Sequence, residues 1–213
     1  MDNLDSRNIV LFARNSCHEI AKELNLDYFL ELDDDYTSFR YRYDDGKKLA
    51  SSSVTNFDKI IEIVIDFLEK SSAITVAFGQ TGDMIGGFSS QLYQNRIKRK
   101  AMNSFFCKTN KPFEFLGRIN EDTNCYSLLG SQGKLFITIA DITLDQLETQ
   151  KNMGGLTDSY LDLGTYVKSF YTVICNPSCS KVSVMGDGHY RFHHKILWEN
   201  TVPKIISDRF KIK

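Results

Sequence analysis

The sequence predicts an α/β fold in a single domain over residues 1–213, with a mixed sheet flanked by helices. Two observations support this class. Segments rich in apolar and β-branched residues alternate along the chain with segments whose apolar residues recur at the helical period. No internal repeat and no obvious linker divides the chain, so these segments are expected to share one core.

The helices are predicted from the spacing of apolar residues. The first begins at Asn15 or Ser16, either of which can cap it. The strongest follows Thr55 or Asn56, again two possible caps, and its apolar side chains recur every three or four residues. In chain order, the predicted helices span residues 15–24, 57–70, 120–130 and 158–173.

The strands are predicted from short apolar or alternating runs. Residues 37–43 alternate aromatic and polar side chains, which is typical of a half-exposed strand. Residues 73–78 are almost entirely apolar, which is typical of a buried strand. In chain order, the predicted strands span residues 28–32, 37–43, 73–78, 105–107, 113–116, 134–140, 181–185 and 190–197.

The composition indicates a globular protein, because 42% of the residues are hydrophobic and 25% are charged. No apolar run is long enough to cross a bilayer, and the polar, acidic start of the chain is no secretory signal, so we expect a cytoplasmic protein without a membrane partner. The net charge of −1 gives no general attraction to nucleic acid. One basic run, residues 96–100, is either a solvated face or a phosphate contact.

The most informative feature is a predicted strand that runs directly into Asp33, Asp34 and Asp35. Ligands of α/β sheets bind at the carboxyl ends of strands, where this triplet falls. Adjacent carboxylates repel one another unless solvent or a cation offsets their charge, and their oxygens suit Mg²⁺ or Mn²⁺ bound together with a substrate phosphate. Taken alone, the triplet is as compatible with a solvated turn as with a metal site.

The residues around the triplet resemble a segment of the GT-A glycosyltransferases. The run Ala-Arg-Asn at residues 13–15, a helix and then residues 28–35 are similar to the segment that carries the DXD motif of that family. The resemblance implies that Asp33 and Asp35 hold a divalent cation, Mn²⁺ or Mg²⁺, on the diphosphate of a nucleotide sugar. It also places three residues beside that donor: Arg14, Asn15 and Asp34.

Residues 117–122 resemble a second motif of the family, in which an acidic residue at a helix start removes a proton from the acceptor hydroxyl. Asp122 or Glu121 would be this catalytic base, because a carboxylate there can accept the proton as the new bond forms. The alternative is structural, since Asp122, directly before Thr123, is well suited to cap the helix.

Many GT-A enzymes also present a late histidine to the metal, and His193 and His194 stand at the matching place. Successive residues of a strand point to opposite faces, so only one of the two would face the site. We expect His194, which shares a face with Phe192 and Ile196, to be the metal ligand, with His193 as the second candidate.

Two glycine-containing loops are further candidates for donor binding. Gly86 and Gly87 end a loop that could bring the backbone close to a sugar, although no Lys-Ser/Thr follows to make it a P-loop. Lys151 and Asn152 precede a predicted helix whose first amides could bind phosphate. For each loop, a simple turn explains the sequence as well as a ligand-binding site does.

More narrowly, residues 14–204 resemble the TET-associated glycosyltransferases of phages and related genomes, which are thought to add sugars to modified bases in DNA. This resemblance implies a nucleotide sugar as donor and a hydroxyl of DNA as acceptor, and the basic run at 96–100 would suit DNA. GT-A domains normally place their first nucleotide-binding strands before the segment that begins at residue 13, and the chain lacks them there. We therefore expect a homo-oligomer or a separate polypeptide that supplies the N-terminal half-domain.

Two other functions fit the same residues. The chain could be a non-catalytic binding or assembly protein derived from the GT-A fold. It could also be a metal-dependent phosphodiesterase or nuclease that uses the same acids and histidines.

Overall fold

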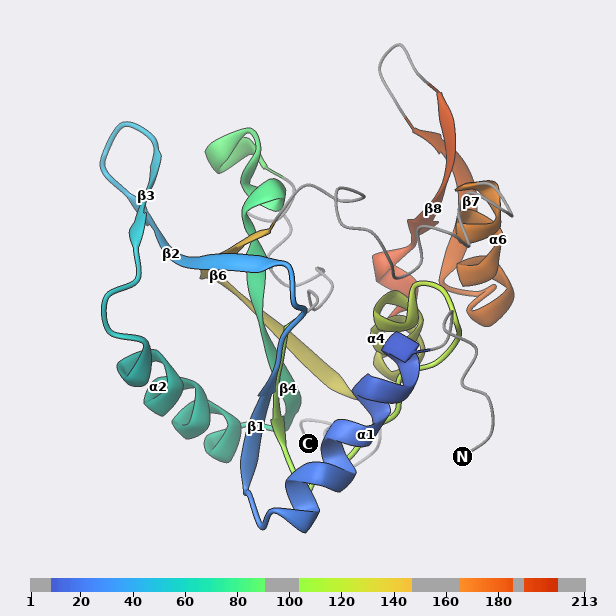
Figure 1. Cartoon of the computed structure of the whole chain (residues 1–213). Coiled ribbons are helices and arrows are strands. Elements are labelled where there is room, and N and C mark those ends of the chain that lie inside the picture. Colours follow the sequence, from blue (N-terminus) through green and yellow to red (C-terminus); the bar gives the residue numbers. More distant parts are fainter. Residues whose placement is uncertain (1–8, 91–103, 147–164, 186–189, 203–213) are drawn as a thin grey trace, which may run out of the picture.

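The centre of the fold is a six-stranded mixed sheet (Figure 1). The computed structural model describes residues 9–90, 104–146, 165–185 and 190–202 of the chain. The strands of this sheet are Tyr28–Glu31 (β1), Tyr36–Asp44 (β2), Leu49–Ser53 (β3), Ala73–Gln80 (β4), Phe105–Lys108 (β5) and Leu135–Gln146 (β6). Their order in the sheet is β1-β5-β4-β6-β2-β3. β4 and β6 pair in parallel at the centre, and the other neighbouring pairs are antiparallel.

One face of the sheet is covered by the helix α2, Phe57–Lys70. Its N-cap is Asn56, whose side-chain oxygen accepts a hydrogen bond from the backbone N–H of Lys59 at 3.1 Å. The predicted bounds and one of the two predicted caps are thus confirmed, because this helix is specified by local sequence. The helix residues buried against the strands are Ile60, Val64 and Leu68.

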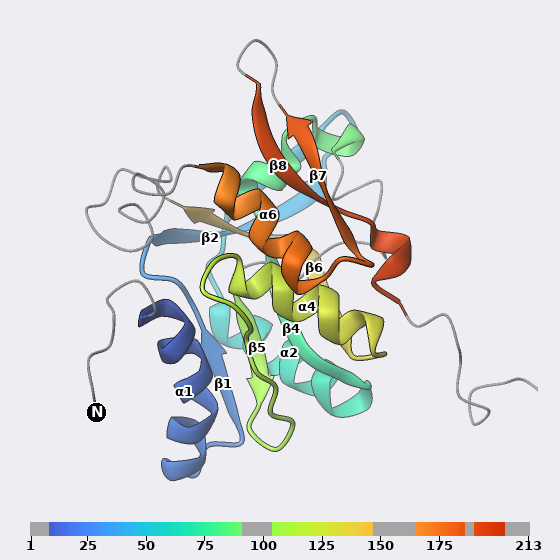
Figure 2. The same cartoon turned by 90° about the vertical axis from the view of Figure 1, so that its right-hand side faces the viewer.

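The opposite face carries two helices, α1 (Ile9–Glu23) and α4 (Glu121–Ser131) (Figures 1 and 2). The prediction for α1 was wrong at its start, because the helix begins at Ile9 and Asn15 lies within it, not at its cap. The core between these helices and the sheet is rich in aromatic side chains, including Phe105, Phe113, Phe115 and Tyr126.

A smaller unit packs against α4 (Figure 2). It consists of the helix α6, Thr165–Cys175, and a two-stranded sheet of β7, Ser180–Met185, and β8, Arg191–Ile196. The predicted helix over 158–173 therefore ends two residues later, and its first seven residues lie outside the described part of the chain. Short 3₁₀ turns complete the described elements: η2 (Thr81–Met84), η3 (Gly87–Ser89) and η4 (Trp198–Asn200).

One predicted strand, residues 113–116, does not form, since this segment is an irregular loop before α4. Its alternating Phe113 and Phe115 pack into the aromatic core from the loop, which satisfies the same hydrophobic pattern without a strand. No helix in the described ranges is long and apolar enough to cross a membrane.

Candidate active site

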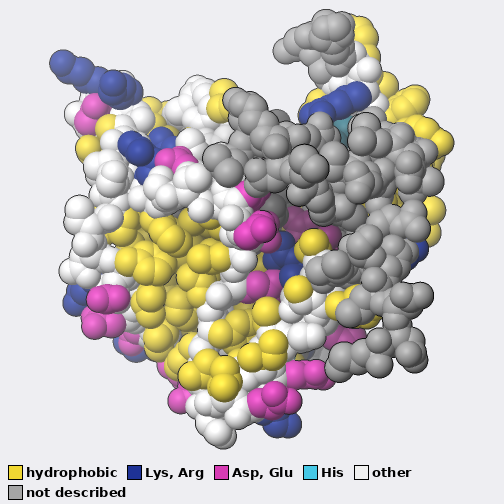
Figure 3. Space-filling model, viewed as in Figure 1, with side chains coloured by type: hydrophobic (Ala, Val, Ile, Leu, Met, Phe, Trp, Pro, Cys, Tyr) yellow, Lys and Arg dark blue, Asp and Glu magenta, His cyan; other side chains and the backbone are white. Residues whose placement is uncertain are grey.

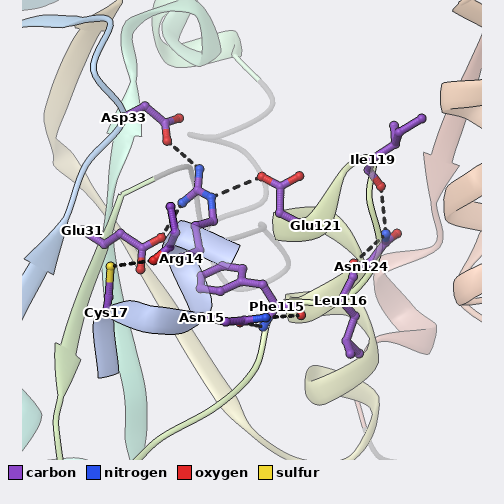
Figure 4. A network of polar contacts seen from close by, with 11 residues as sticks. Arg14, Asn15, Cys17, Glu31, Asp33, Phe115, Leu116, Ile119, Glu121 and Asn124 are labelled. Carbon is purple, nitrogen blue, oxygen red and sulfur yellow. Dashed lines mark hydrogen bonds and ion pairs between the residues drawn. The ribbon is translucent and has the colours of Figure 1, made fainter. Parts of the chain in front are cut away.

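A buried arginine, Arg14 of α1, lies at the centre of a carboxylate network (Figure 4). Its Nη1 lies 2.8 Å from Oε1 of Glu31, its Nη2 2.5 Å from Oδ1 of Asp33, and its Nε 3.2 Å from Oε1 of Glu121. The side chain is only 6% exposed. One guanidinium group therefore forms ion pairs with the end of β1, the aspartate triplet and the first residue of α4.

Two aromatic rings complete the surroundings of Arg14. Its guanidinium carbon lies 5.5 Å from the ring centroid of Phe105 and 5.3 Å from that of Phe115. Burial by itself would lower the pKa of Arg14, but the charges of the neighbouring carboxylates, Asp33 first, outweigh it and raise the pKa. Arg14 is therefore a permanent buried cation, and it is stable there because it is fully paired.

Beside this network lies a pocket of about 440 Å³ lined by six acidic side chains. Three segments that are far apart in the sequence meet here: residues 10–17 of α1, residues 31–35 and the start of α4. In Figure 3, acidic side chains surround a basic one near the centre of the face shown. The acidic residues that line the pocket are Glu31, Asp33, Asp34, Asp35, Glu121 and Asp122.

The start of α4 is anchored by Asn120, whose backbone is left-handed with φ of 55°. Its side chain makes no capping bond, and Nδ2 donates instead to the carbonyl of Lys168 at 2.9 Å and to Oγ1 of Thr172 at 2.8 Å. Asp122 is the second residue of the helix, so the capping alternative for Asp122 is wrong. Its half-buried carboxylate lines the pocket and receives no hydrogen bond from the described residues.

The loop before α4 is fixed by Asn15. Its Nδ2 donates to the carbonyl of Phe115 at 3.2 Å, and its Oδ1 accepts from the backbone N–H of Phe115 at 2.8 Å (Figure 4). Two residues on, Gly117 has φ of +88°, and a Cβ there would meet Asn124 and Tyr171 at 2.7 Å. Asn15 thus positions the acidic end of α4, and it is not among the residues that line the pocket.

Asp35 is attached to the sheet through a pair of glutamines. Nε2 of Gln146 donates to Oδ2 of Asp35 at 2.7 Å, and Nε2 of Gln80 donates to Oε1 of Gln146 at 3.1 Å. The other carboxylate oxygen, Oδ1, is buried and has no hydrogen-bond partner in the described part of the chain. A buried oxygen of this kind is costly unless a donor or a cation reaches it.

The acids of the site are held at unusual pKa values. Burial raises the pKa of Glu31 to about 7 and that of Asp33 to about 6, although the charge of Arg14 acts in the opposite direction. The pKa of Glu121 is also raised, first by burial and then by the charge of Asp122. The pocket therefore contains more carboxylates than one arginine can balance, which favours a cation.

The donor chemistry fits Mg²⁺ or Mn²⁺, because the pocket offers hard carboxylate oxygens and Oδ1 of Asp35 is unpaired. Among the described residues, no three His, Cys, Asp or Glu side chains are grouped as a metal site requires. One oxygen of Asp33 is bound to Arg14. Asp33 and Asp35 stay candidate ligands on the strength of the sequence motif and the unpaired oxygen of Asp35.

The two predicted histidine ligands stand beside the acidic helix start and outside the pocket lining. Nδ1 of His194 lies 3.5 Å from Nδ2 of Asn120, the residue before Glu121. The rings of His193 and His194 stack with centroids 4.4 Å apart, so the expectation that the two diverge to opposite faces was wrong.

Of the two predicted glycine loops, the described one does not line the pocket. Gly86 and Gly87 lie at η3, where Gly87 packs near Leu49 of β3, away from the pocket lining. Lys151 and Asn152 lie outside the described residues, as does the basic run at 96–100.

Glu31 is the residue of this site that sequence reasoning missed. A signal was present, because Glu31 ends an otherwise apolar strand and lies two residues before Asp33. Residues two apart in a strand share a face, so a carboxylate at this position is expected to point toward the same ligand or counter-ion as Asp33.

The mixed sheet with helices on both faces is consistent with the GT-A-like class of α/β folds. A model of the TET-Associated Glycosyltransferase family matches residues 1–155, and with most of its length matched the chain belongs to this family of glycosyltransferases. The match includes Arg14, the aspartate triplet and α4, and it ends before His193 and His194. Searches of curated proteins and of solved structures found no match.

Proposed function

We propose that this glycosyltransferase transfers a sugar from a nucleotide sugar to an acceptor hydroxyl with the help of Mg²⁺ or Mn²⁺, and that the acceptor is a modified base in DNA. The observation that supports this most is the convergence of Arg14, the aspartate triplet and the acidic start of α4 on one pocket of about 440 Å³. The volume is of the size that binds a small molecule.

Asp33 and Asp35 are the proposed metal ligands, with Asp34 at the rim toward the donor. When bound, the cation would offset the charge of the diphosphate as it leaves. The buried Oδ1 of Asp35 has no described partner, which supports its assignment as a direct ligand. His194 is a further candidate ligand, since it lies next to the residue that precedes Glu121.

Asp122 is the proposed base. Its carboxylate faces the pocket without a described hydrogen-bond donor, so it is available to accept the proton of the acceptor hydroxyl. Glu121, in contrast, is buried and bound to Arg14, which suits a positioning role. Arg14 would then hold the base helix and the metal-binding turn at a fixed separation instead of binding the donor itself.

The test is transfer of label by the purified full chain. Radiolabelled nucleotide sugars are incubated with Mn²⁺ and with DNA that contains hydroxymethylated bases. We expect label on the DNA for the wild type and none for Asp33→Asn. Cleaved but unlabelled DNA would instead support a nuclease, and no turnover of any nucleotide sugar by the self-associated chain, with or without DNA, would contradict the proposal.

A further inference from the structure

A second and larger pocket, of about 850 Å³, lies at the other end of β1 from the acidic pocket. It is bordered by the C-terminal half of α1, the start of β1, the end of α2 and the turn after β5. Helix α1 contributes to both pockets, through Cys17 to the acidic one and through His18 to the second. No residue lines both pockets, so the second is a separate site.

The walls of the second pocket are built by backbone hydrogen bonds. Helix α1 ends in a Schellman motif, in which Asn25 is left-handed (φ 54°) and the N–H of Leu26 donates to the carbonyl of Ala21 at 2.9 Å. Across the pocket, the N–H of Thr109 donates to the carbonyl of Asp27 at 2.9 Å. These bonds hold the backbone of the pocket walls in place, so a ligand needs only side-chain rotation to reach polar atoms of the lining.

The buried charge in the pocket is already paired. Nζ of Lys108 lies 2.5 Å from Oε1 of Glu69, and the hydroxyl of Tyr28 donates to the same carboxylate. The remaining charged side chains of the lining are Glu19, Lys22 and Asp27. The lining thus combines two lysines with three carboxylates, which gives little attraction for a strongly charged ligand of either sign.

Two side chains in this lining, the buried His18 and the half-buried Thr109, have buried polar atoms without partners among the described residues. His18 is 9% exposed, its ring meets Phe29 and Phe113 edge-on, and neither ring nitrogen has a hydrogen-bond partner within the described structure. Oγ1 of Thr109 is buried without a partner as well. Burial lowers the pKa of His18, which keeps the imidazole neutral, with one donor and one acceptor nitrogen.

We propose that this pocket binds a small, neutral, hydroxyl-rich ligand, of which a free sugar is the simplest example, and that His18 and Thr109 are its polar contacts. A hydroxyl group both donates and accepts, as do a neutral imidazole and a threonine hydroxyl. Such a ligand therefore satisfies these three buried atoms when rotation of the two side chains brings them to the pocket surface. The side-chain amides of Asn25 and Asn110 border the same space and extend this capacity.

The experiment is a titration of the ¹⁵N-labelled full chain with D-glucose, D-galactose and maltose, observed through the imidazole nitrogens of His18 by NMR. We expect a saturable shift of the His18 signals with at least one sugar. The shift should be absent in Thr109→Val and unchanged in Thr55→Val, which removes an exposed hydroxyl elsewhere. His18→Phe preserves the aromatic contacts, so it should fold and lose sugar binding in calorimetry.

Three results would overturn the proposal: His18 signals that respond to none of the sugars, equal sugar affinity in wild type and both pocket variants, or a response to uridine alone. The readout does not depend on catalysis, so a failure of the transfer reaction leaves this test intact. Conversely, loss of sugar binding in Thr109→Val says nothing against the acidic pocket, to whose lining Thr109 does not belong.

Discussion

Nε of Arg14 and Oε1 of Glu121 lie 3.2 Å apart in space, although 107 positions separate the two residues in the sequence. The contact joins the first helix of the chain to the helix that carries the proposed base. Because Arg14 also binds Glu31 and Asp33, this one side chain holds carboxylates from three parts of the acidic pocket at fixed positions.

Arg14→Met should destabilise the protein by roughly 3–5 kcal/mol, because it leaves buried carboxylates without their counter-ion. The matched control is Arg40→Met. Arg40 is half-exposed and lies 3.6 Å from Asp145, so its loss should cost roughly 0–1 kcal/mol. Urea unfolding of both variants measures the difference, and equal losses would show that the Arg14 network contributes no special stability.

Stability should fall as the pH rises from about 5 to about 8. The pKa of Glu31 is raised from 4.5 to about 7 and that of Asp33 from 3.8 to about 6, so the folded state binds these protons more tightly than the unfolded state. The contribution of these two groups to the free energy of unfolding is fully present below their pKa values in the unfolded state. It is lost as the pH rises through their pKa values in the folded state. Glu121, whose pKa is raised to about 7, adds to this fall. His18 acts in the opposite direction below its usual pKa of 6.5, because burial lowers its pKa, but it is one group against three. Asp45, Glu69 and Asp145 have lowered pKa values and act only at more acidic pH.

Thermal unfolding at a series of pH values measures this dependence. Glu31→Gln should flatten the profile, since its side chain cannot ionise. A wild-type melting temperature that rises between about pH 5 and about pH 8 would contradict the sign worked out from these groups.

The sequence was sufficient to predict an element where local interactions decide its structure. The spacing of apolar residues and the cap at Asn56 specify α2 without help from the rest of the chain. The sequence was insufficient to predict the bounds of an element where tertiary contacts override local preference. Asn15 is a good cap by type, yet its amide pairs with the backbone of Phe115, a hundred residues away, and the helix starts earlier.

The same distinction applies to the candidate site. The aspartate triplet and Glu121 with Asp122 could be predicted because each forms a short motif, and the structure brings them to one pocket. The ion pairs of Arg14 could not, since they depend on how three separate segments pack. The motifs also say nothing of orientation, which is why the stacking of His193 and His194 was not foreseen.

Asp122→Asn should lower kcat by about 10²- to 10⁴-fold with little change in the fold. Asp122 is not at the N-cap position, which Asn120 occupies, so the substitution costs only the favourable charge at the helix N-terminus, about 0.3–1 kcal/mol. Glu121→Gln is the informative comparison, because it weakens the contact with Arg14 and should cost more stability. Circular dichroism and steady-state transfer kinetics give both readouts; a wild-type kcat in Asp122→Asn would assign the base to another residue.

Asp35→Ala should abolish or strongly weaken binding of Mn²⁺ and Mg²⁺, because it removes the one buried oxygen of the triplet that has no described partner. Calorimetry in the presence and absence of a nucleoside diphosphate measures the effect, and the diphosphate should strengthen binding to the wild type. Asp66→Ala, on the exposed side of α2, is the control for loss of one negative charge. Equal metal binding by all three proteins would exclude Asp35 as a ligand.

The free edge of β1 should make the chain self-associate or bind a partner. β1 pairs with β5 on one side only in the described sheet, and an unpaired edge beside apolar surface invites a further strand. Apolar side chains gather between α2 and β1 in Figure 3, and Ile63 and Phe67 of α2 are 58% and 40% exposed. We expect an oligomer in light scattering and little transfer activity from the isolated monomer.

Ile63→Glu with Phe67→Glu should shift the protein toward the monomer if α2 borders the contact. Ile174→Glu, an exposed change on α6, should not. A wild-type monomer that turns over a nucleotide sugar unaided would refute the expectation of a partner.

The bidentate contact between Asn15 and Phe115 has a consequence for the order of folding. Helix α1 leaves the ribosome about a hundred residues before the loop that it must hold, so the acidic pocket cannot assemble until most of the chain has been synthesised. Contacts between such distant segments form slowly, because a long loop must close first. Until then Arg14 lacks Glu121, its partner in α4, and the acidic pocket is completed only after α4 has been synthesised.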